Sequence, residues 1–156
     1  MSPVSPVKPQ PAEPSSTAAS VGIVLVSHSR ALAEAALDLA RRLIVAVDVP
    51  IELAAGLDDG ELGTDAGVIV SAVEQLADRC DGVLVLADLG SGIMSAEMAL
   101  EMLEPAVAER VRLSAAPFVE GLLGAYGAAG IGKDLQAVAA EADGAAEAKR
   151  SQVAAF

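Results

Sequence analysis

The residue types that build the commonest metal and redox sites are nearly missing from this chain of 156 residues. Cys80 is the only cysteine, so the chain can form neither an internal disulfide nor a cysteine-based metal cluster. A reducing compartment suits such a chain, and Cys80 is expected to be a small buried apolar residue. There is also one histidine, His28. Zinc hydrolysis is therefore disfavoured, and no metal site is expected.

Basic residues are scarce as well. Ten Lys and Arg stand against 22 Asp and Glu, giving a formal net charge of −12 and a sequence pI near 4.3. So acidic a surface repels phosphate backbones, which argues against nucleic acid and anionic membranes as partners. No apolar run approaches the length of a membrane span. We expect a cytoplasmic protein whose acidity mainly serves solubility.

Three segments differ in composition. Residues 1–20 hold five of the eight prolines and lack the apolar centre of a signal peptide, which predicts a disordered extension. Residues 21–145 are expected to form one domain. Residues 146–156, rich in Ala with one Glu and one Lys, are expected to be a frayed tail.

Short apolar runs alternate with segments of helical periodicity throughout this domain. Strands are predicted at 21–26, 51–55, 82–88 and 111–116. Helices are predicted after residue 29, from about residue 64 with Thr64 as N-cap, and at about 93–103. A last helical region starts at about residue 119 and is broken near 130–132. The alternation predicts an α/β three-layer sandwich with a mainly parallel sheet in the order 2-1-3-4 and helices on both faces. Ligand sites in such sheets form at the carboxyl ends of the strands, at the point where the strand order reverses. Here that point lies between the first and third strands.

His28 follows the first strand between two small hydroxyl residues, at that crevice. A structural histidine is more often embedded in an apolar face, so a functional role is favoured. Imidazole is a nucleophile near neutral pH if its other ring nitrogen is held in the right tautomer. Asp88, which ends the third strand, is placed to hold it, although the same residue could simply cap the next helix.

A phosphoryl group on His28 would need local compensation for its charge. Helix N-termini supply unpaired N–H groups, glycines allow a close approach and serines add hydroxyl donors. The expected phosphate-binding residues are Ser27, Ser29, Gly90, Ser91 and Gly92. A Walker-type P-loop and a serine-hydrolase elbow are absent from the sequence.

Two further sequence patterns bear on the function. A receiver domain phosphorylated on Asp88 would need an acidic pair after the first strand, where Ser27 and His28 stand instead. Met94, Met98 and Met102 recur every four residues, a pattern typical of core or dimer packing.

Several ordered motifs resemble one known family. They are VLVSHS at 24–29, AAGLDD at 54–59, GTD at 63–65, VLADLGS at 85–91 and APFVEG at 116–121. Together they are similar to the phosphotransferase (DhaM-type) subunits of phosphoenolpyruvate-dependent dihydroxyacetone kinases. These subunits belong to the mannose-type enzyme IIA group of the bacterial phosphotransferase system.

The resemblance implies a phosphotransferase with a phosphohistidine at His28, supported by Asp88. The implied donor is phospho-HPr, the acceptor is Mg-ADP on a DhaL-type subunit, and a DhaK-type subunit binds dihydroxyacetone; this chain itself would need no cofactor. A homodimer is implied too. Thr64, Asp65 and Glu120 match family motifs without an assigned role. Some members continue into HPr-like domains, and since none follows here, a separate donor is expected. The alternative is a docking module that carries phosphate only as a regulatory signal.

Overall fold

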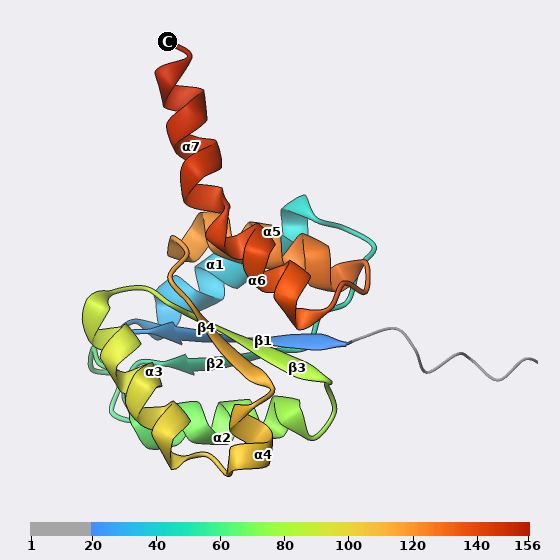
Figure 1. The fold of residues 1–156 in the computed structure, drawn as a ribbon. Coiled ribbons are helices and arrows are strands. Elements are labelled where there is room, and N and C mark those ends of the chain that lie inside the picture. Colours follow the sequence, from blue (N-terminus) through green and yellow to red (C-terminus); the bar gives the residue numbers. More distant parts are fainter. Residues whose placement is uncertain (1–19) are drawn as a thin grey trace, which may run out of the picture.

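The computed structural model describes residues 20–156, and the predicted extension lies outside this range except for Ser20. A four-stranded sheet forms the centre (Figure 1). Its strands are β1 (Val21–Ser27), β2 (Ile51–Ala55), β3 (Gly82–Ala87) and β4 (Val111–Ser114). All neighbours pair in parallel in the order β2-β1-β3-β4, which confirms the predicted topology.

The two central strands are apolar on both faces because helices cover both sides of the sheet. Every residue of β1 and β3 is buried, as is typical of strands inside a parallel sheet. They pair directly, with Val21 opposite Gly82 and Val26 opposite Ala87. This register brings the carboxyl ends of the two strands to the same edge, where His28 and Asp88 follow.

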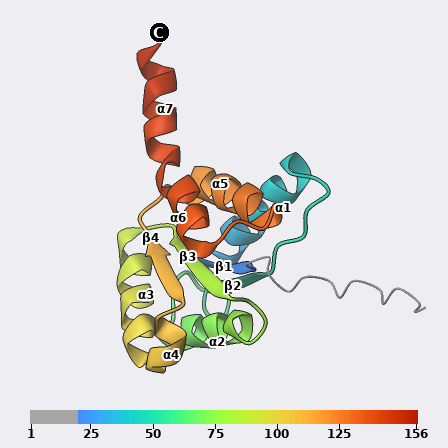
Figure 2. The same ribbon diagram turned by 45° about the vertical axis from the view of Figure 1, so that its right-hand side comes forward.

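Helices form one layer on each side of the sheet (Figures 1 and 2). The upper layer holds α1 (Arg30–Leu43), α5 (Phe118–Gly130) and α6 (Leu135–Asp143). The lower layer holds α2 (Ala66–Ala77), α3 (Gly90–Met102) and the short α4 (Pro105–Ala108). The core is correspondingly split by the sheet into two apolar clusters. The three-layer sandwich is therefore confirmed.

Close helix packing in the upper layer depends on small residues. A Cβ atom built on Gly124 of α5 would lie 2.9 Å from the carbonyl oxygen of Glu141 in α6. Any side chain at position 124 would therefore push the two helices apart. The predicted break between these helices is also confirmed, since α5 ends at Gly130 and α6 begins at Leu135.

Several boundaries differ from expectation, including the end of β4, which lies at Ser114 and not at residue 116. Helix α3 begins at Gly90, about three residues early, and the buried Gly92 lies within its first turn, where a Cβ atom would lie 3.2 Å from Asp88 Oδ1. The N-cap of α2 is Asp65, whose Oδ1 accepts the N–H of Val68, since the hydroxyl of Thr64 is engaged by another helix. A short helix that was not among the predicted elements, α4, begins at Pro105.

The carboxyl-terminal segment is more ordered than expected. Residues Ala145–Ala154 form the helix α7, which projects away from the body of the domain (Figures 1 and 2). The predicted frayed tail is therefore largely helical, and the high helix propensity of alanine accounts for this. Within residues 20–156, no helix combines the length and apolar character needed to cross a bilayer.

One side-chain prediction is confirmed, and of the two alternatives for the methionine stripe the core one is wrong. Cys80 is buried, as expected, and burial raises the pKa of its thiol above the ordinary value. The methionine stripe does not join the core of the chain: Met94, Met98 and Met102 are all exposed on α3. The faces of α3 that pack inward carry small residues instead, among them Ala96 and Ala99.

Candidate functional site

His28 occupies the turn between β1 and α1 at the carboxyl edge of the sheet. Ser27 before it is the last residue of the strand, and Ser29 after it is the N-cap of the helix. The imidazole is 22% exposed, so it is supported on one side and open on the other. This placement agrees with the predicted crevice between β1 and β3.

Asp88 is the direct partner of His28. The distance between His28 Nδ1 and Asp88 Oδ1 is 2.9 Å, and the backbone N–H of His28 donates to Asp88 Oδ2 at 3.0 Å. The backbone N–H of Asp88 in turn donates to the carbonyl oxygen of Val26 at 3.1 Å. Ladder bonds between β1 and β3 thus fix the aspartate relative to the histidine.

The environment of Asp88 keeps its carboxyl group ionised. Its side chain is 6% exposed, and it also accepts from Ser27 Oγ at 3.0 Å and from the backbone N–H of Leu89 at 2.8 Å. Burial by itself raises the pKa of Asp88, but the hydrogen bonds from the backbone and ring of His28 and from Ser27 outweigh it and lower the pKa below its usual value.

This arrangement assigns the histidine tautomer. An ionised carboxylate can only accept, so Nδ1 carries the hydrogen and donates to Asp88. In the neutral form of the ring, the other nitrogen, Nε2, then keeps its lone pair. Ser91 Oγ lies 2.6 Å from Nε2 and is the donor to it in that form. Nε2 is then an oriented nucleophilic nitrogen at the exposed side of the ring.

The expected phosphate-binding residues differ in their exposure and in their hydrogen bonds. Gly90 and Ser91 are exposed in the first turn of α3, whose N-cap makes no side-chain cap bond. Ser29 Oγ accepts the N–H of Leu32 as the cap of α1. Ser27 is completely buried and donates towards Asp88, so it supports the aspartate and cannot face an incoming group.

Gly92 has a steric role. A Cβ atom at this position would lie 3.2 Å from Asp88 Oδ1 and 3.7 Å from His28 Cε1. The glycine therefore permits α3 to begin directly against the histidine–aspartate pair.

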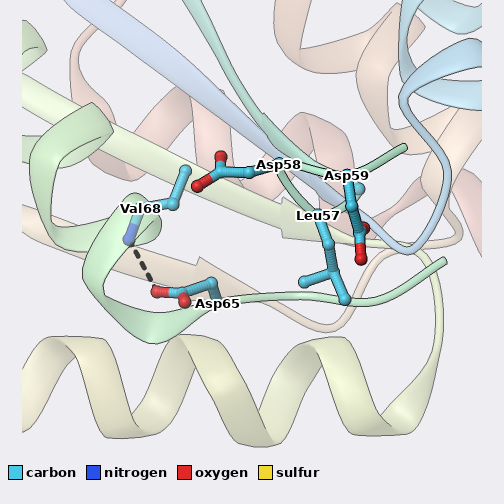
Figure 3. Close-up of a pocket in the computed structure, with 6 residues that line it drawn as sticks. Leu57, Asp58, Asp59, Asp65 and Val68 are labelled. Carbon is cyan, nitrogen blue, oxygen red and sulfur yellow. Dashed lines mark hydrogen bonds between the residues drawn. The ribbon is translucent and has the colours of Figure 1, made fainter. Parts of the chain in front are cut away.

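The loop between β2 and α2 is attached to the histidine turn. The N–H of Gly56 donates to the carbonyl of Ser27 at 3.0 Å, and that of Gly63 donates to the carbonyl of His28 at 2.9 Å. The loop also encloses a hollow of about 280 Å³ lined by Gly56, Leu57, Asp58, Asp59, Asp65 and Val68 (Figure 3). Among residues 20–156, no three His, Cys, Asp or Glu side chains are grouped to hold a metal ion.

The three residues that match family motifs, Thr64, Asp65 and Glu120, form no hydrogen bond or ion pair with the His28 side chain. Thr64 Oγ1 lies 2.7 Å from Ser95 Oγ, which connects the loop to α3. Asp65 caps α2. Glu120 pairs with Lys149 of α7, and the hydrogen bond from Lys149 lowers the pKa of Glu120.

Sequence reasoning missed Ser95 and the backbone bond from Gly63. Ser95 follows Ser91 by one helical turn, so their common face was visible in the spacing. The bond from Gly63 to His28 joins segments far apart in sequence, and no local pattern indicates it.

Curated relatives are similar in sequence to most of this chain. The chain is 47% identical over 135 residues to the phosphoryl donor subunit DhaM of the PEP-dependent dihydroxyacetone kinase of Escherichia coli (strain K12). The alignment covers 85% of this chain and 28% of that relative, so the chain spans less than a third of its length. A shorter DhaM subunit, from kinase 2 of Listeria innocua, is 36% identical over 101 residues, with 65% of this chain and 79% of the relative covered.

Solved structures share the fold. The crystal structure of EF1359, a protein of unknown function, is 31% identical and superposes with a TM-score of 0.72, covering 80% of this chain and 93% of that one. A sigma-54 interaction domain protein from Enterococcus faecalis has a TM-score of 0.62 at 18% identity, which shows the fold alone. Residues 22–139 match the family EIIA-man, "PTS system fructose IIA component", and this chain therefore belongs to that family.

Proposed function

We propose that this chain is the phosphoryl-carrier subunit of a phosphoenolpyruvate-dependent dihydroxyacetone kinase. One observation carries the proposal: Asp88 holds Nδ1 of His28, which leaves the lone pair of Nε2 at the exposed side of the ring. The names of the relatives, phosphoryl donor subunits of such kinases, supply the reaction. The chain accepts the group from phospho-HPr and passes it to ADP on a DhaL-type subunit.

The transfer is an in-line displacement at phosphorus. The lone pair of His28 Nε2 forms the new P–N bond while the P–N bond of the donor phosphohistidine breaks, and the donor imidazole keeps that electron pair. The ring of His28 becomes cationic, and the ionised Asp88 beside Nδ1 stabilises this charge. In the second step an ADP phosphate oxygen attacks phosphorus, and Nε2 recovers its lone pair.

The first turn of α3 is suited to the transferred group. Ser91 Oγ already contacts Nε2, and on phosphorylation its hydroxyl is free to donate to a phosphoryl oxygen instead. The backbone N–H groups at the start of α3 lack a side-chain cap and lie at the positive end of the helix dipole. These groups offset negative charge that an acidic protein otherwise disfavours.

The remaining chemistry belongs to other proteins in this proposal. Mg-ADP is bound by the DhaL-type acceptor, dihydroxyacetone by a DhaK-type subunit, and the relay operates in the cytoplasm with this chain as a homodimer. In this proposal His28 uses no cofactor on its own chain, since an imidazole nitrogen with a free lone pair is itself the nucleophile.

The test is a labelling experiment with phosphoenolpyruvate, enzyme I and HPr. The parent chain should acquire one acid-labile phosphoryl group, and His28→Ala should acquire none. Glu147→Gln, on the projecting helix α7, is a surface control and should label like the parent. Full labelling of His28→Ala would overturn the proposal.

Reconstitution separates the carrier from the regulatory alternative. When DhaK-type and DhaL-type subunits are added, dihydroxyacetone phosphorylation should require this chain with His28 intact. If the labelled chain binds the partners but its phosphoryl group never reaches dihydroxyacetone, the chain is a phosphorylation-dependent docking module.

A further inference from the structure

Three side chains at the carboxyl edge of the sheet form a continuous hydrogen-bonded chain. Asp88 Oδ1 lies 2.9 Å from His28 Nδ1, and His28 Nε2 lies 2.6 Å from Ser91 Oγ. In the neutral form of the ring, the Ser91 hydroxyl donates to Nε2 while the N–H at Nδ1 donates to the carboxylate. A hydroxyl, an imidazole and a carboxylate in this order are the groups that activate a serine nucleophile.

The backbone beside Ser91 supplies donors for an oxyanion. The first hydrogen bond of α3 runs from the N–H of Ile93 to the carbonyl of Leu89 at 3.1 Å. The N–H groups of Ser91 and Gly92 precede it, so they have no carbonyl acceptor within the helix. In hydrolases whose serine lies between a strand and a helix, the N–H of the next residue binds the oxyanion. Gly92 has that position here, at the positive end of the helix dipole.

The local sequence does not have the form of a hydrolase motif. Leu89 and Ile93 stand where the G-x-S-x-G elbow has its outer glycines. A triad is nevertheless defined by the geometry and roles of its three side chains, and these are present. Ser91 is exposed, and a Cβ atom built on the neighbouring Gly90 would meet nothing within 4 Å. The hydroxyl can therefore be reached from solvent.

We propose that Ser91, His28 and Asp88 form a catalytic triad that hydrolyses small, uncharged carboxylic esters while His28 is unphosphorylated. This activity goes beyond phosphoryl transfer, because the imidazole acts as a base and Ser91 is the nucleophile. Uncharged esters are favoured because the chain has a net charge of −12 and α3 contains no Lys or Arg. Small esters are favoured because an exposed serine offers little surface to hold a long acyl chain.

The reaction proceeds in two balanced halves. Ser91 Oγ attacks the carbonyl carbon, and its proton passes to His28 Nε2. The tetrahedral oxyanion accepts from the N–H of Gly92 and then collapses, the bond to the alcohol breaks, and Nε2 returns the proton to the leaving oxygen. Water attacks the acyl-serine in the same way and releases the carboxylic acid. Asp88 stabilises the cationic ring in both halves.

The first experiment measures hydrolysis of p-nitrophenyl acetate by the chain. The parent should release p-nitrophenolate faster than free imidazole at the same concentration. Ser91→Ala and His28→Gln should each lower the rate at least about 100-fold. Ser71→Ala removes an exposed serine from α2 and is the matched control, which should equal the parent. A parent no faster than free imidazole would overturn the proposal.

The second experiment identifies the nucleophile. Phenylmethanesulfonyl fluoride should sulfonylate Ser91 Oγ with loss of fluoride, and mass spectrometry of the digested chain locates the adduct. Ser71 is an internal reference for an exposed serine without a histidine partner and should stay unmodified. His28→Gln should prevent the reaction at Ser91. A sulfonyl group on His28, or parent-like ester hydrolysis by Ser91→Ala, would show that the imidazole acts alone and would overturn the triad.

Phosphorylation of His28 should switch the ester hydrolysis off. A phosphoryl group on Nε2 occupies the lone pair that accepts the proton of Ser91. Treatment with phosphoenolpyruvate, enzyme I and HPr should therefore lower the hydrolysis rate in proportion to the phosphorylated fraction, and an unchanged rate in the fully phosphorylated chain would overturn the triad. This comparison alone rests on the proposed function. A parent that hydrolyses the ester but accepts no phosphoryl group would overturn the carrier function and leave the triad.

Discussion

Asp88 binds His28 at two points at once: one carboxylate oxygen lies 2.9 Å from Nδ1, and the other accepts the backbone N–H of the same residue at 3.0 Å. The carboxylate therefore fixes both the turn that carries the imidazole and the rotation of the ring. With Ser27 Oγ and the N–H of Leu89, four donors converge on one side chain that can only accept while it is ionised.

Asp88→Asn should slow the charging of His28, that is, its phosphorylation by phospho-HPr, by about 100-fold. An amide presents one acceptor and one donor, so at least one of the four donors would face an NH₂ group. The ring would also lose the negative charge that stabilises its cationic form. Charging rates from phospho-HPr measure the effect, with Asp65→Asn as a control that keeps a capping side chain on α2. Parent-like rates would reduce Asp88 to a structural residue.

The unfolding free energy of the parent should depend on pH through the ionisation of Asp88. The folded-state pKa of Asp88 is lowered, so its stabilising contribution is fully present above the unfolded-state value of about 3.9 and is lost as pH falls through the lower folded-state pKa. Denaturant unfolding of parent and Asp88→Asn should give a difference in unfolding free energy that is constant near neutral pH and shrinks below about pH 4. A difference that grows on acidification would contradict the lowered pKa.

Ser91→Ala should affect transfer more than stability. The exposed hydroxyl contacts Nε2 at 2.6 Å, and its loss removes a donor for the phosphoryl group. We expect charging to slow by at least about tenfold and unfolding free energy to change by less than about 1 kcal/mol. Ser91→Thr keeps the hydroxyl and should recover most of the rate. If the Ser91→Ala and Ser91→Thr variants are phosphorylated equally fast, the hydroxyl takes no part in the transfer.

Gly92→Ala tests how closely α3 must approach the pair formed by His28 and Asp88. The added methyl group would meet Asp88 Oδ1 at 3.2 Å and displace it from His28. The gain in helix propensity, up to about 1 kcal/mol, should keep the fold near parent stability. Charging should nevertheless fall about tenfold or more, because small displacements at reacting groups are costly. Unchanged charging would show that the site tolerates the shift.

Gly124→Ala tests the contact between α5 and α6. Its methyl group would lie 2.9 Å from the carbonyl of Glu141, and we expect a loss of about 1–3 kcal/mol in unfolding free energy. Gly127→Ala is the matched control on the same helix, since its nearest neighbour is Ile44 Cδ1 at 3.7 Å. That variant should equal or exceed the parent in stability. Similar values for both variants would mean that the helices separate without cost.

The sequence was informative wherever a local pattern decides the structure. Buried strands such as β1 read as continuous apolar runs, and alternation with helices implies the parallel order, so the juxtaposition of His28 and Asp88 followed. The predicted start of α3 was about three residues late because the glycines at 90 and 92 have low helix propensity, although both lie in the first turn of the helix. The exposure of Met98 could not be known, since helical spacing marks a face without saying what covers it.

The carbonyl oxygens of Ser27 and His28 each accept a bond from the loop after β2, and Asp88 is itself tied to β1. Neither the His28 turn nor Asp88 can therefore detach without breaking sheet or turn bonds. Amide exchange at these positions should report opening of the whole sheet, and a preparation that loses carrier activity on warming should lose its parallel sheet over the same temperature range.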